Sequence, residues 1–312
     1  MAALTRSYLK VPYDLRPAKQ VERRMLIDAL GRLTHAQFPI SEYQYTGMGS
    51  IYFVDFLLFR KLLGIRRMLS VEADDSIPKR LRFNRPFKDV EICNAPIAEV
   101  IPTLSRDRRH LLWLDYDSVI YREHVEDIVN AAAVLSIESI LLITLDVEPP
   151  DGDGPDDWLQ HFRREAEDHL GANIAPQRFR KSFLSKRNCE IVSSAIEQGL
   201  TGREARFIPI FHFLYRDGHQ MLTVGGMIGT EEQRRRVDTS TLGQTVFFRA
   251  DLKQPAYEIR VPRLTRKERL YLDGHMPCGK HWAPGQFELS ADEVAAYRDI
   301  YPFFPAYAEL LL

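Results

Sequence analysis

The chain has 312 residues, of which 45% are hydrophobic and 27% are charged, a composition typical of a globular protein and not of a disordered, collagen-like or coiled-coil chain. Its formal net charge of −1 removes any argument for attraction of the whole molecule to nucleic acid or anionic lipid, although local patches remain. No run approaches the ~20 apolar residues of a membrane span and the start lacks a secretory apolar core, so we expect a cytoplasmic protein with no membrane partner.

The first segment, residues 1–40, is predicted to be a helical lead-in. Pro17 suits the first turn of a helix, where its missing N–H is not needed. Apolar side chains then recur at helical spacing, at Val21, Met25, Leu26 and Leu30. The pattern predicts one amphipathic helix before the first strand.

Between residues 41 and 150, short apolar runs alternate with helical stretches. Five of these runs resemble buried strands: 42–46, 67–72, 89–93, 110–115 and 139–145. Alternation of this kind is typical of parallel βαβ units wound right-handedly. The sequence therefore predicts an α/β protein built on a parallel sheet.

A helical insertion and a hairpin follow. Residues 151–200 open with a turn-rich acidic segment and continue as helix, so we expect an insertion at the surface. Two further apolar runs, 206–215 and 220–228, flank Asp217-Gly218. Asp-Gly between two such runs is a strong signal for an antiparallel hairpin.

These elements divide the chain into a lead-in, a core and an extension. The core spans residues 41–230, and residues 231–312 are expected to form a C-terminal extension packed on it. Within the extension, Thr265 and Glu268 have the spacing of a capping box, which predicts a helix start.

The turn after the first predicted strand is the most informative segment. Gly47 and Gly49 stand between an apolar strand and an apolar helix, and glycine lets a ligand approach the backbone closely. Tyr52 holds the position of the third glycine of a dinucleotide fingerprint, and no Walker sequence is present. A nucleotide-sugar group without a pyrophosphate therefore fits this turn better.

Polar residues follow the next three predicted strands. Glu72 ends the second strand, where a carboxylate can accept both hydrogen bonds of a ribose diol. Asn94 follows the third strand, and Asp115 and Asp117 follow the fourth. Open α/β sheets bind and react at the carboxyl ends of their strands, so we expect a site there.

Taken in order, these motifs resemble the class I, Rossmann-like S-adenosylmethionine-dependent methyltransferases over about residues 40–230. The resemblance rests on the Thr46-Gly-Met-Gly49 turn, Glu72, Asn94-Ala95, Leu114-Asp115 and the hairpin. It implies a mostly parallel seven-stranded sheet with an antiparallel terminal hairpin, and S-adenosylmethionine as cofactor. The cofactor-binding residues that it implies are Tyr45, Thr46, Gly47, Gly49, Ser50, Glu72, Asn94, Ala95 and Asp115.

A second resemblance concerns a metal. The magnesium-dependent O-methyltransferases of the catechol type have segments that are similar to Trp113–Asp117 and Leu142–Asp146 of this chain. It implies Asp115 and Asp146 as Mg²⁺ ligands, with Asp117 as a third, and a bound metal would lower the pKa of an acceptor hydroxyl. The chain has Asp146-Val147 where that family has Asp-Asn.

The activity that follows is methyl transfer to an oxygen nucleophile, or less favourably to nitrogen, with Asp115 and Asp117 as catalytic residues. Residues 15–19 and 261–265 also resemble bacterial proteins labelled as O-methyltransferases, a label that carries no established substrate. The acceptor is not specified by the sequence. The oligomeric state that we expect is a homodimer.

Several alternatives stay open. The basic stretches 60–88 and 178–187 could track phosphate in a nucleic-acid-modifying methyltransferase, although the Asn/Asp-Pro-Pro-Tyr/Phe motif of amino-methylating DNA enzymes is absent. The protein could also bind the cofactor without catalysis and regulate a partner. Glu72 could pair with a nearby arginine, and Asp115 and Asp117 could cap the helix that starts near residue 121.

Overall fold

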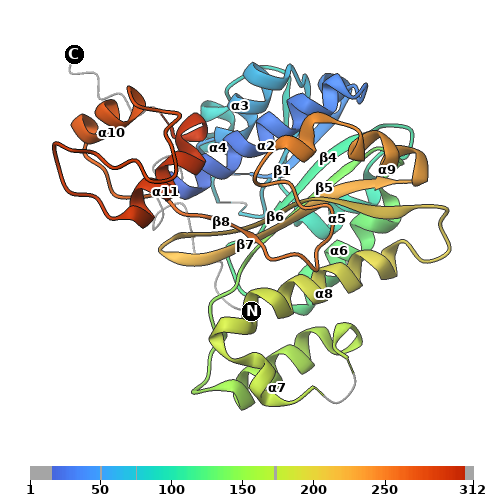
Figure 1. Ribbon diagram of the computed structural model, residues 1–312. Helices are drawn as coiled ribbons and strands as arrows, with labels where there is room; N and C mark the ends of the chain where they lie inside the picture. Colours follow the sequence, from blue (N-terminus) through green and yellow to red (C-terminus); the bar gives the residue numbers. More distant parts are fainter. Residues whose placement is uncertain (1–15, 50, 75, 172–173, 306–312) are drawn as a thin grey trace.

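One mixed sheet organises the computed structural model, which describes residues 16–49, 51–74, 76–171 and 174–305. Within these residues eight strands follow the order β3-β2-β1-β4-β5-β7-β6-β8 (Figure 1). The strands are β1 (Gln44–Met48), β2 (Arg67–Val71), β3 (Val90–Cys93), β4 (His110–Asp115), β5 (Ile140–Asp146), β6 (Arg206–Asp217), β7 (His219–Gly229) and β8 (Tyr257–Ile259). Only β7 runs antiparallel to its neighbours, β5 and β6.

The α/β fold class and the terminal hairpin are confirmed. All seven predicted strands exist, and β6 and β7 turn at Asp217 and Gly218 as expected. The first strand lies two residues later than predicted, because Ile40–Glu42 forms a 3₁₀ turn. The described sheet has eight strands instead of the expected seven. The additional strand, β8, pairs with the edge of β6, with Tyr257 opposite Phe213. A strand of three residues carries no periodicity from which it could be predicted.

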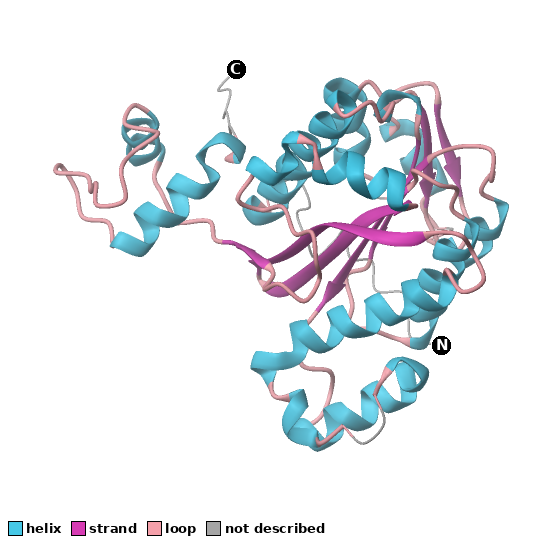
Figure 2. Ribbon diagram, turned by 45° about the vertical axis from the view of Figure 1, so that its right-hand side comes forward, coloured by secondary structure: helices cyan, strands magenta, loops and turns pink. Residues whose placement is uncertain are grey.

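Helices cover both faces of the sheet (Figure 2). They are α2 (Pro17–His35), α3 (Val54–Leu63), α4 (Pro78–Asn84), α5 (Ile97–Val100), α6 (Arg122–Val134), α7 (Pro155–Ala166), α8 (Leu184–Gly199), α9 (Glu231–Asp238), α10 (Arg266–Asp273) and α11 (Ala291–Ile300). The 3₁₀ turns are η1 (Ile40–Glu42), η2 (Ile101–Thr103), η3 (Glu167–His169), η4 (Pro176–Phe179), η5 (Lys181–Phe183), η6 (Thr241–Gln244) and η7 (Tyr301–Phe303). At α10, Thr265 accepts from the backbone N–H of Glu268, which confirms the predicted capping box.

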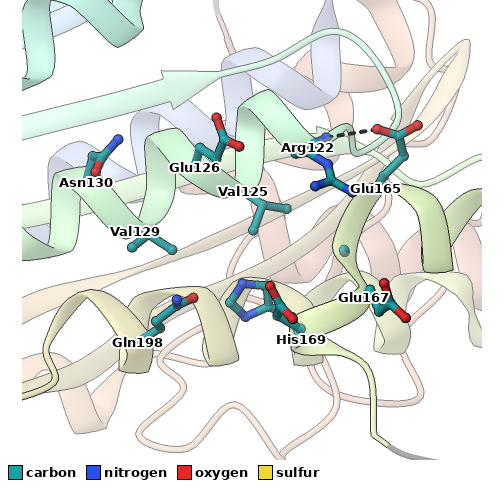
Figure 3. Close-up of a pocket in the computed structure, with 11 residues that line it drawn as sticks. Arg122, Val125, Glu126, Val129, Asn130, Glu165, Glu167, His169 and Gln198 are labelled. Carbon is teal, nitrogen blue, oxygen red and sulfur yellow. Dashed lines mark hydrogen bonds between the residues drawn. The ribbon is translucent and has the colours of Figure 1, made fainter.

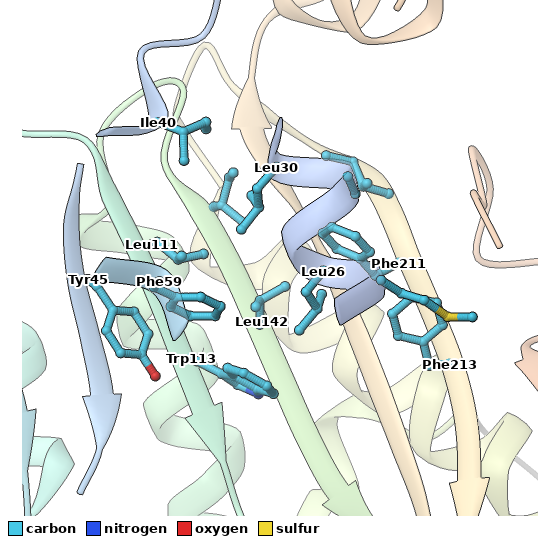
Figure 4. Close-up of a cluster of buried hydrophobic side chains, with 14 of the residues drawn as sticks. Leu26, Leu30, Ile40, Tyr45, Phe59, Leu111, Trp113, Leu142, Phe211 and Phe213 are labelled. Carbon is cyan, nitrogen blue, oxygen red and sulfur yellow. The ribbon is translucent and has the colours of Figure 1, made fainter. Parts of the chain in front are cut away.

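Two apolar cores result from the alternation of side chains along the strands. Leu111 and Trp113 of β4 belong to the core under α2, α3 and α4, which Figure 4 shows in part. Leu112 and Leu114 point the other way, into the core under α6, α7 and α8. This two-faced burial is typical of a parallel sheet covered by helices.

The hairpin turn holds the start of α2. The carboxylate of Asp217 accepts hydrogen bonds from the backbone N–H groups of Ala18 and Lys19, at 3.0 and 2.8 Å. These groups lack partners within the helix, and a negative charge also suits the positive end of the helix dipole. The first helix of the chain is thus fixed to the carboxyl edge of the sheet by a residue of the hairpin.

Two glycines in helices give opposite predictions for the same substitution. A Cβ on Gly199 of α8 would approach the carbonyl oxygen of Val129 and lie 2.7 Å from the Cβ of Ala132 on α6, whereas no described atom lies within 4 Å of a Cβ on Gly31. We expect Gly199→Ala to lower the free energy of unfolding by about 1–3 kcal/mol. Gly31→Ala should raise it by about 0.5–1 kcal/mol, because alanine favours the helix.

Urea denaturation of the two variants tests this close crossing. Gly31→Ala is the matched control, since both substitutions add one methyl group to a helix. If Gly199→Ala were stabilised as much as Gly31→Ala, α6 and α8 would not pack as closely as described.

Candidate functional site

The glycine turn at the end of β1 packs closely against β2. Gly49 donates its backbone N–H to the carbonyl of Val71, and a Cβ on Gly49 would lie 2.6 Å from Ser70 Oγ. A Cβ on Gly47 would collide with the hydroxyl of Tyr45. Packing within the chain is therefore sufficient to require both glycines, whatever ligand the turn also contacts.

Glu72 lies directly after β2, at the carboxyl edge of the sheet. Its carboxylate accepts the backbone N–H of Asp74 at 3.0 Å, and its own N–H donates to Cys93 at 3.0 Å. No described residue forms an ion pair with Glu72. Burial raises the pKa of this carboxyl group above its ordinary value, and the nearby carboxylates of Asp74 and Asp117 raise it further. The pairing with a nearby arginine is thus not formed, and Asp117 belongs to the same electrostatic environment as Glu72.

The other residues expected to bind a cofactor fall into two groups. Asn94 is exposed directly after β3, and Ala95 beside it is half-buried. Tyr45 and Thr46 are buried within β1, where the ring of Tyr45 packs edge-on against Phe56 at 4.9 Å. Ser50 lies outside the described residues. Of these positions, Asn94 presents a polar side chain at the open edge, whereas Tyr45 is part of the core.

Asp115 ends β4 and forms an ion pair with the N-terminal helix. Its Oδ1 lies 2.8 Å from Nζ of Lys19, and its side chain keeps 26% of its surface exposed. No described residue hydrogen-bonds Oδ2. The helix that follows begins at Arg122, with Tyr121 as its N-cap residue, so neither Asp115 nor Asp117 caps it. That alternative is wrong because the loop after β4 is too long.

Lys19 bridges two carboxylates inside the protein. Its ammonium lies 2.9 Å from Oε2 of Glu22, and only 1% of Lys19 and none of Glu22 is exposed. The same ammonium lies 4.3 Å from the ring centroid of Trp113, a cation–π distance. Burial raises the pKa of Glu22, and the charge of Lys19 opposes this effect.

Hydroxyl groups complete this network. Thr223 of β7 donates to Glu22 and also contacts the hydroxyl of Thr144 at 2.8 Å. Thr144 accepts the indole N–H of Trp113 at 3.0 Å. Each buried polar group of the network except one Glu22 oxygen, which faces Lys19, has a hydrogen-bonding partner, as low-dielectric surroundings require.

The roles of Lys19 and Glu22 were not predicted from the sequence, although a signal was present. The buried stripe of α2 runs through Leu26, Ala29 and Leu33 at helical spacing. Extended back by the same steps of three and four residues, this stripe passes through Glu22 and Lys19. Two charged residues on the apolar face of a helix indicate a buried ion pair.

The residues proposed as Mg²⁺ ligands do not fit a metal. Asp115 is neutralised by Lys19, and Oδ2 of Asp146 lies 2.6 Å from Nδ1 of His219. Throughout the described ranges, no group of three or more His, Cys, Asp or Glu side chains is placed to hold a metal ion. Each carboxylate already has a partner in the protein, so the metal hypothesis has no support in this arrangement.

A separate cavity of about 280 Å³ lies between α6, η3 and α8 (Figure 3). Arg122, Glu126, His169 and Gln198 are among its lining residues, and the backbone N–H of Arg122 donates to Glu165 at 3.1 Å. None of the residues that the sequence singled out lines it. The candidate site is therefore the carboxyl edge of the sheet and not this cavity.

The arrangement of strands, the glycine turn after β1 and the acidic residues that follow β2 and β4 define the class I, Rossmann-like methyltransferase architecture. A protein-family model described as "Putative O-methyltransferase" matches residues 11–312, so the chain belongs to that family. No curated protein matches the sequence. None of the helices in the described part of the chain has the length and apolar character that a bilayer span requires.

Solved structures give more distant likenesses. Trm1 from Pyrococcus horikoshii, solved with S-adenosyl-L-methionine, is 13% identical with a TM-score of 0.45, over 70% of this chain and 56% of that one. A probable spermidine synthase from Corynebacterium glutamicum is 13% identical with a TM-score of 0.43, over 66% and 63%. A predicted O-methyltransferase from Agrobacterium tumefaciens is 12% identical with a TM-score of 0.34, over 62% and 81%. The match thus spans less than two thirds of the length of the first two proteins.

The buried charges of α2 make a prediction about stability. Replacing Lys19 by Met leaves Glu22 and Asp115 facing each other without their cation, so the free energy of unfolding should fall by about 3–5 kcal/mol. The double variant Lys19→Met/Glu22→Gln should lose clearly less, because the uncompensated buried charge is gone. Chemical denaturation of the single and double variants measures both effects.

A surface pair supplies the control for this prediction. Arg234 and Asp238 on α9 lie 2.9 Å apart and are both partly exposed. Arg234→Met should cost less than about 1 kcal/mol. Equal losses for Lys19→Met and the double variant would show that Glu22 does not need its cation.

Proposed function

We propose that this chain transfers a methyl group from S-adenosylmethionine to an oxygen nucleophile. The family to which it belongs supports this activity. The observation that carries the proposal is Glu72, a half-buried carboxylate at the carboxyl edge of the sheet with no cation among the described residues. The described hydrogen bonds of this partly desolvated carboxylate come from the backbone and not from a cation, so it can accept further donors, and a ribose diol offers two.

The residues present fit the cofactor. Glu72 would accept from the ribose, exposed Asn94 on the adjacent strand would meet the adenine edge, and the backbone of the turn from Gly47 to Gly49 would border the amino-acid part. The buried hydroxyl of Ser70, beside Gly49, has no partner in the described structure and faces the same turn. Bound S-adenosylmethionine supplies a sulfonium methyl group open to displacement.

Asp115 is the candidate general base. Lys19 holds Oδ1 at 2.8 Å, which favours one orientation of the carboxylate, and the side chain stays 26% exposed. An acceptor hydroxyl placed beside this side chain would pass its proton to Oδ2 as its oxygen attacks the methyl group. Because such a displacement is mostly a matter of alignment, a fixed carboxylate is more useful than a mobile one.

Asp117 has a different environment. It is exposed, and its charge acts on Glu72. We therefore assign Asp117 to the cofactor side of the edge and Asp115 to the acceptor side. This division replaces the pair of equivalent catalytic carboxylates that the sequence suggested.

Substitution of Glu72 tests cofactor binding. Glu72→Ala should weaken the binding of S-adenosylhomocysteine by about 1.5–3 kcal/mol, roughly ten- to a hundredfold in Kd, because hydrogen bonds to a charged group are lost. Isothermal titration calorimetry measures this directly. Glu91→Ala, which removes an exposed glutamate of β3, is the control and should bind like the parent. If Glu72→Ala also bound like the parent, the proposed cofactor geometry would be wrong.

Substitution of Asp115 separates catalysis from binding. Asp115→Asn should leave the affinity for S-adenosylhomocysteine nearly unchanged, and should reduce methyl transfer at least about a hundredfold, the lower range for a general base. Transfer of tritiated methyl groups from S-adenosylmethionine into fractionated cell extracts gives the rate without a known acceptor. Unchanged transfer by Asp115→Asn refutes its role as base. A parent protein that binds the cofactor but labels no fraction is instead a non-catalytic binding protein.

A further inference from the structure

Helix α4 presents an unusual combination of side chains to solvent. Its sequence contains Lys79, Arg80 and Arg82 and no acidic residue. Phe83, on the same short helix, is 88% exposed, the largest exposed fraction among the large apolar side chains of the described structure. The inner side of the helix is fixed by Leu81, which is buried in the core. Lys79, Arg82 and Phe83 are spaced i, i+3 and i+4, so the outer face of the helix carries an aromatic ring together with two positive charges.

Some of the positive charges of this region form no ion pair with a described residue. Lys79, Arg82 and Lys88 are exposed, and none has an acidic partner within ion-pair distance among the described residues. Arg60 nearby is used: it pairs with Asp89 at 2.8 Å and stacks over Phe87. We call Lys79, Arg82, Phe83 and Lys88 the α4 surface.

Helix α4 begins near the candidate site and runs away from it. The helix begins at Pro78, after a short loop that starts at Glu72. Asp74 shapes this loop by accepting the backbone N–H of Ser76 at 2.9 Å. Because β3 is parallel to β2, Lys88, two residues before β3, lies at the amino edge of the sheet, opposite Glu72.

The second basic stretch does not extend this surface. Leu184 at the start of α8 is buried in the core of the opposite sheet face, and Figure 1 shows α8 and α4 on different sides of the molecule. Lys181 pairs with Glu148 at 2.8 Å and Arg187 with Glu190 at 2.5 Å. The stretch 178–187 is therefore partly neutralised and faces elsewhere, so the two stretches do not form one face.

We propose that the α4 surface binds a single-stranded nucleic acid, with a base stacked on Phe83 and phosphates beside Lys79, Arg82 and Lys88. Charge complementarity selects a polyanion, and the exposed ring selects one with unpaired bases, because a base inside a duplex has no free face. The inference goes beyond the proposed function, because the α4 surface extends toward the amino edge of the sheet and not toward Asp115.

The first experiment measures binding and its dependence on salt. Fluorescence anisotropy of a labelled RNA of about 15 uridines, with the full chain, should show binding that weakens roughly twenty- to a hundredfold between about 50 and 200 mM salt, as expected for three to five phosphate contacts on a single strand. A duplex of equal length should bind more weakly. Absence of binding at the lower salt concentration overturns the proposal.

Variants then separate stacking from charge. Phe83→Ala should weaken binding by about five- to a hundredfold, the range for one stacked base, whereas Phe83→Tyr should retain it. Leu270→Ala, which truncates another exposed apolar side chain, should have no effect. Arg82→Ala should flatten the salt dependence, and Arg235→Ala on α9 should not.

Other results of these experiments would show that the α4 surface binds something other than a single-stranded nucleic acid. If labelled heparin binds as well as RNA and Phe83→Ala changes neither, the surface is a general polyanion site and the proposal is wrong. If sedimentation velocity shows a dimer that Phe83→Ala dissociates, a second copy of the chain covers Phe83 and the proposal is also wrong. Titration with S-adenosylhomocysteine is the independent arm. If the protein binds RNA but not S-adenosylhomocysteine, only the proposed function is refuted. If it binds S-adenosylhomocysteine but not RNA, only this inference is refuted.

Discussion

A single buried ammonium group, that of Lys19, joins helix α2 to strand β4 at the carboxyl edge of the sheet. Its one positive charge lies between two carboxylates, Asp115 of β4 at 2.8 Å and Glu22 of its own helix at 2.9 Å, over the ring of Trp113. Removing these charges from water is costly, and their attraction offsets the cost only when the geometry is good and the remaining polar atoms are satisfied. Thr223 and Thr144 supply much of that satisfaction.

This arrangement explains why the edge has two chemically different carboxylate environments. On the side of β4, Asp115 forms an ion pair with Lys19 of α2, which favours one orientation of its carboxylate. On the side of β2, Glu72 is half-buried without a cation and is surrounded by Asp74 and Asp117. A held carboxylate suits proton transfer, and an unpaired one suits the binding of hydroxyl donors. In the proposed function, a single strand, β1, separates these two tasks.

The elements of the fold could be predicted from the sequence because their signals are local. Buried parallel strands are short apolar runs, and Asp217-Gly218 marks its own turn, so the boundaries of β2 to β7 follow closely. Strand β8 could not be predicted, because three residues form it only by pairing with β6. The positions of Glu72 and Asp115 follow from strand ends in the same way.

The partners of these two residues could not be predicted from the sequence in the same way. Which cation neutralises Asp115 is decided by the packing of α2, a long-range contact to which strand periodicity gives no clue. Likewise, the pairing of Asp146 with His219 requires β7 to lie beside β5, and it is this pairing that removes Asp146 as a metal ligand. Local pattern therefore predicts which residues lie at the candidate site, whereas tertiary contacts decide which partners those residues have.

The cap on α2 has a consequence for the order in which the chain acquires its structure during synthesis. The first described helix is anchored by Asp217 and by Thr223, both of which are translated long after it. Until the hairpin has left the ribosome, Lys19 and Glu22 have no low-dielectric interior to enter and remain hydrated. The parallel strands can pair earlier, since their contacts are closer in sequence. Helix α2 is thus among the last elements to dock, and the ion pair of Lys19 with Asp115 is completed only after β7 has been made.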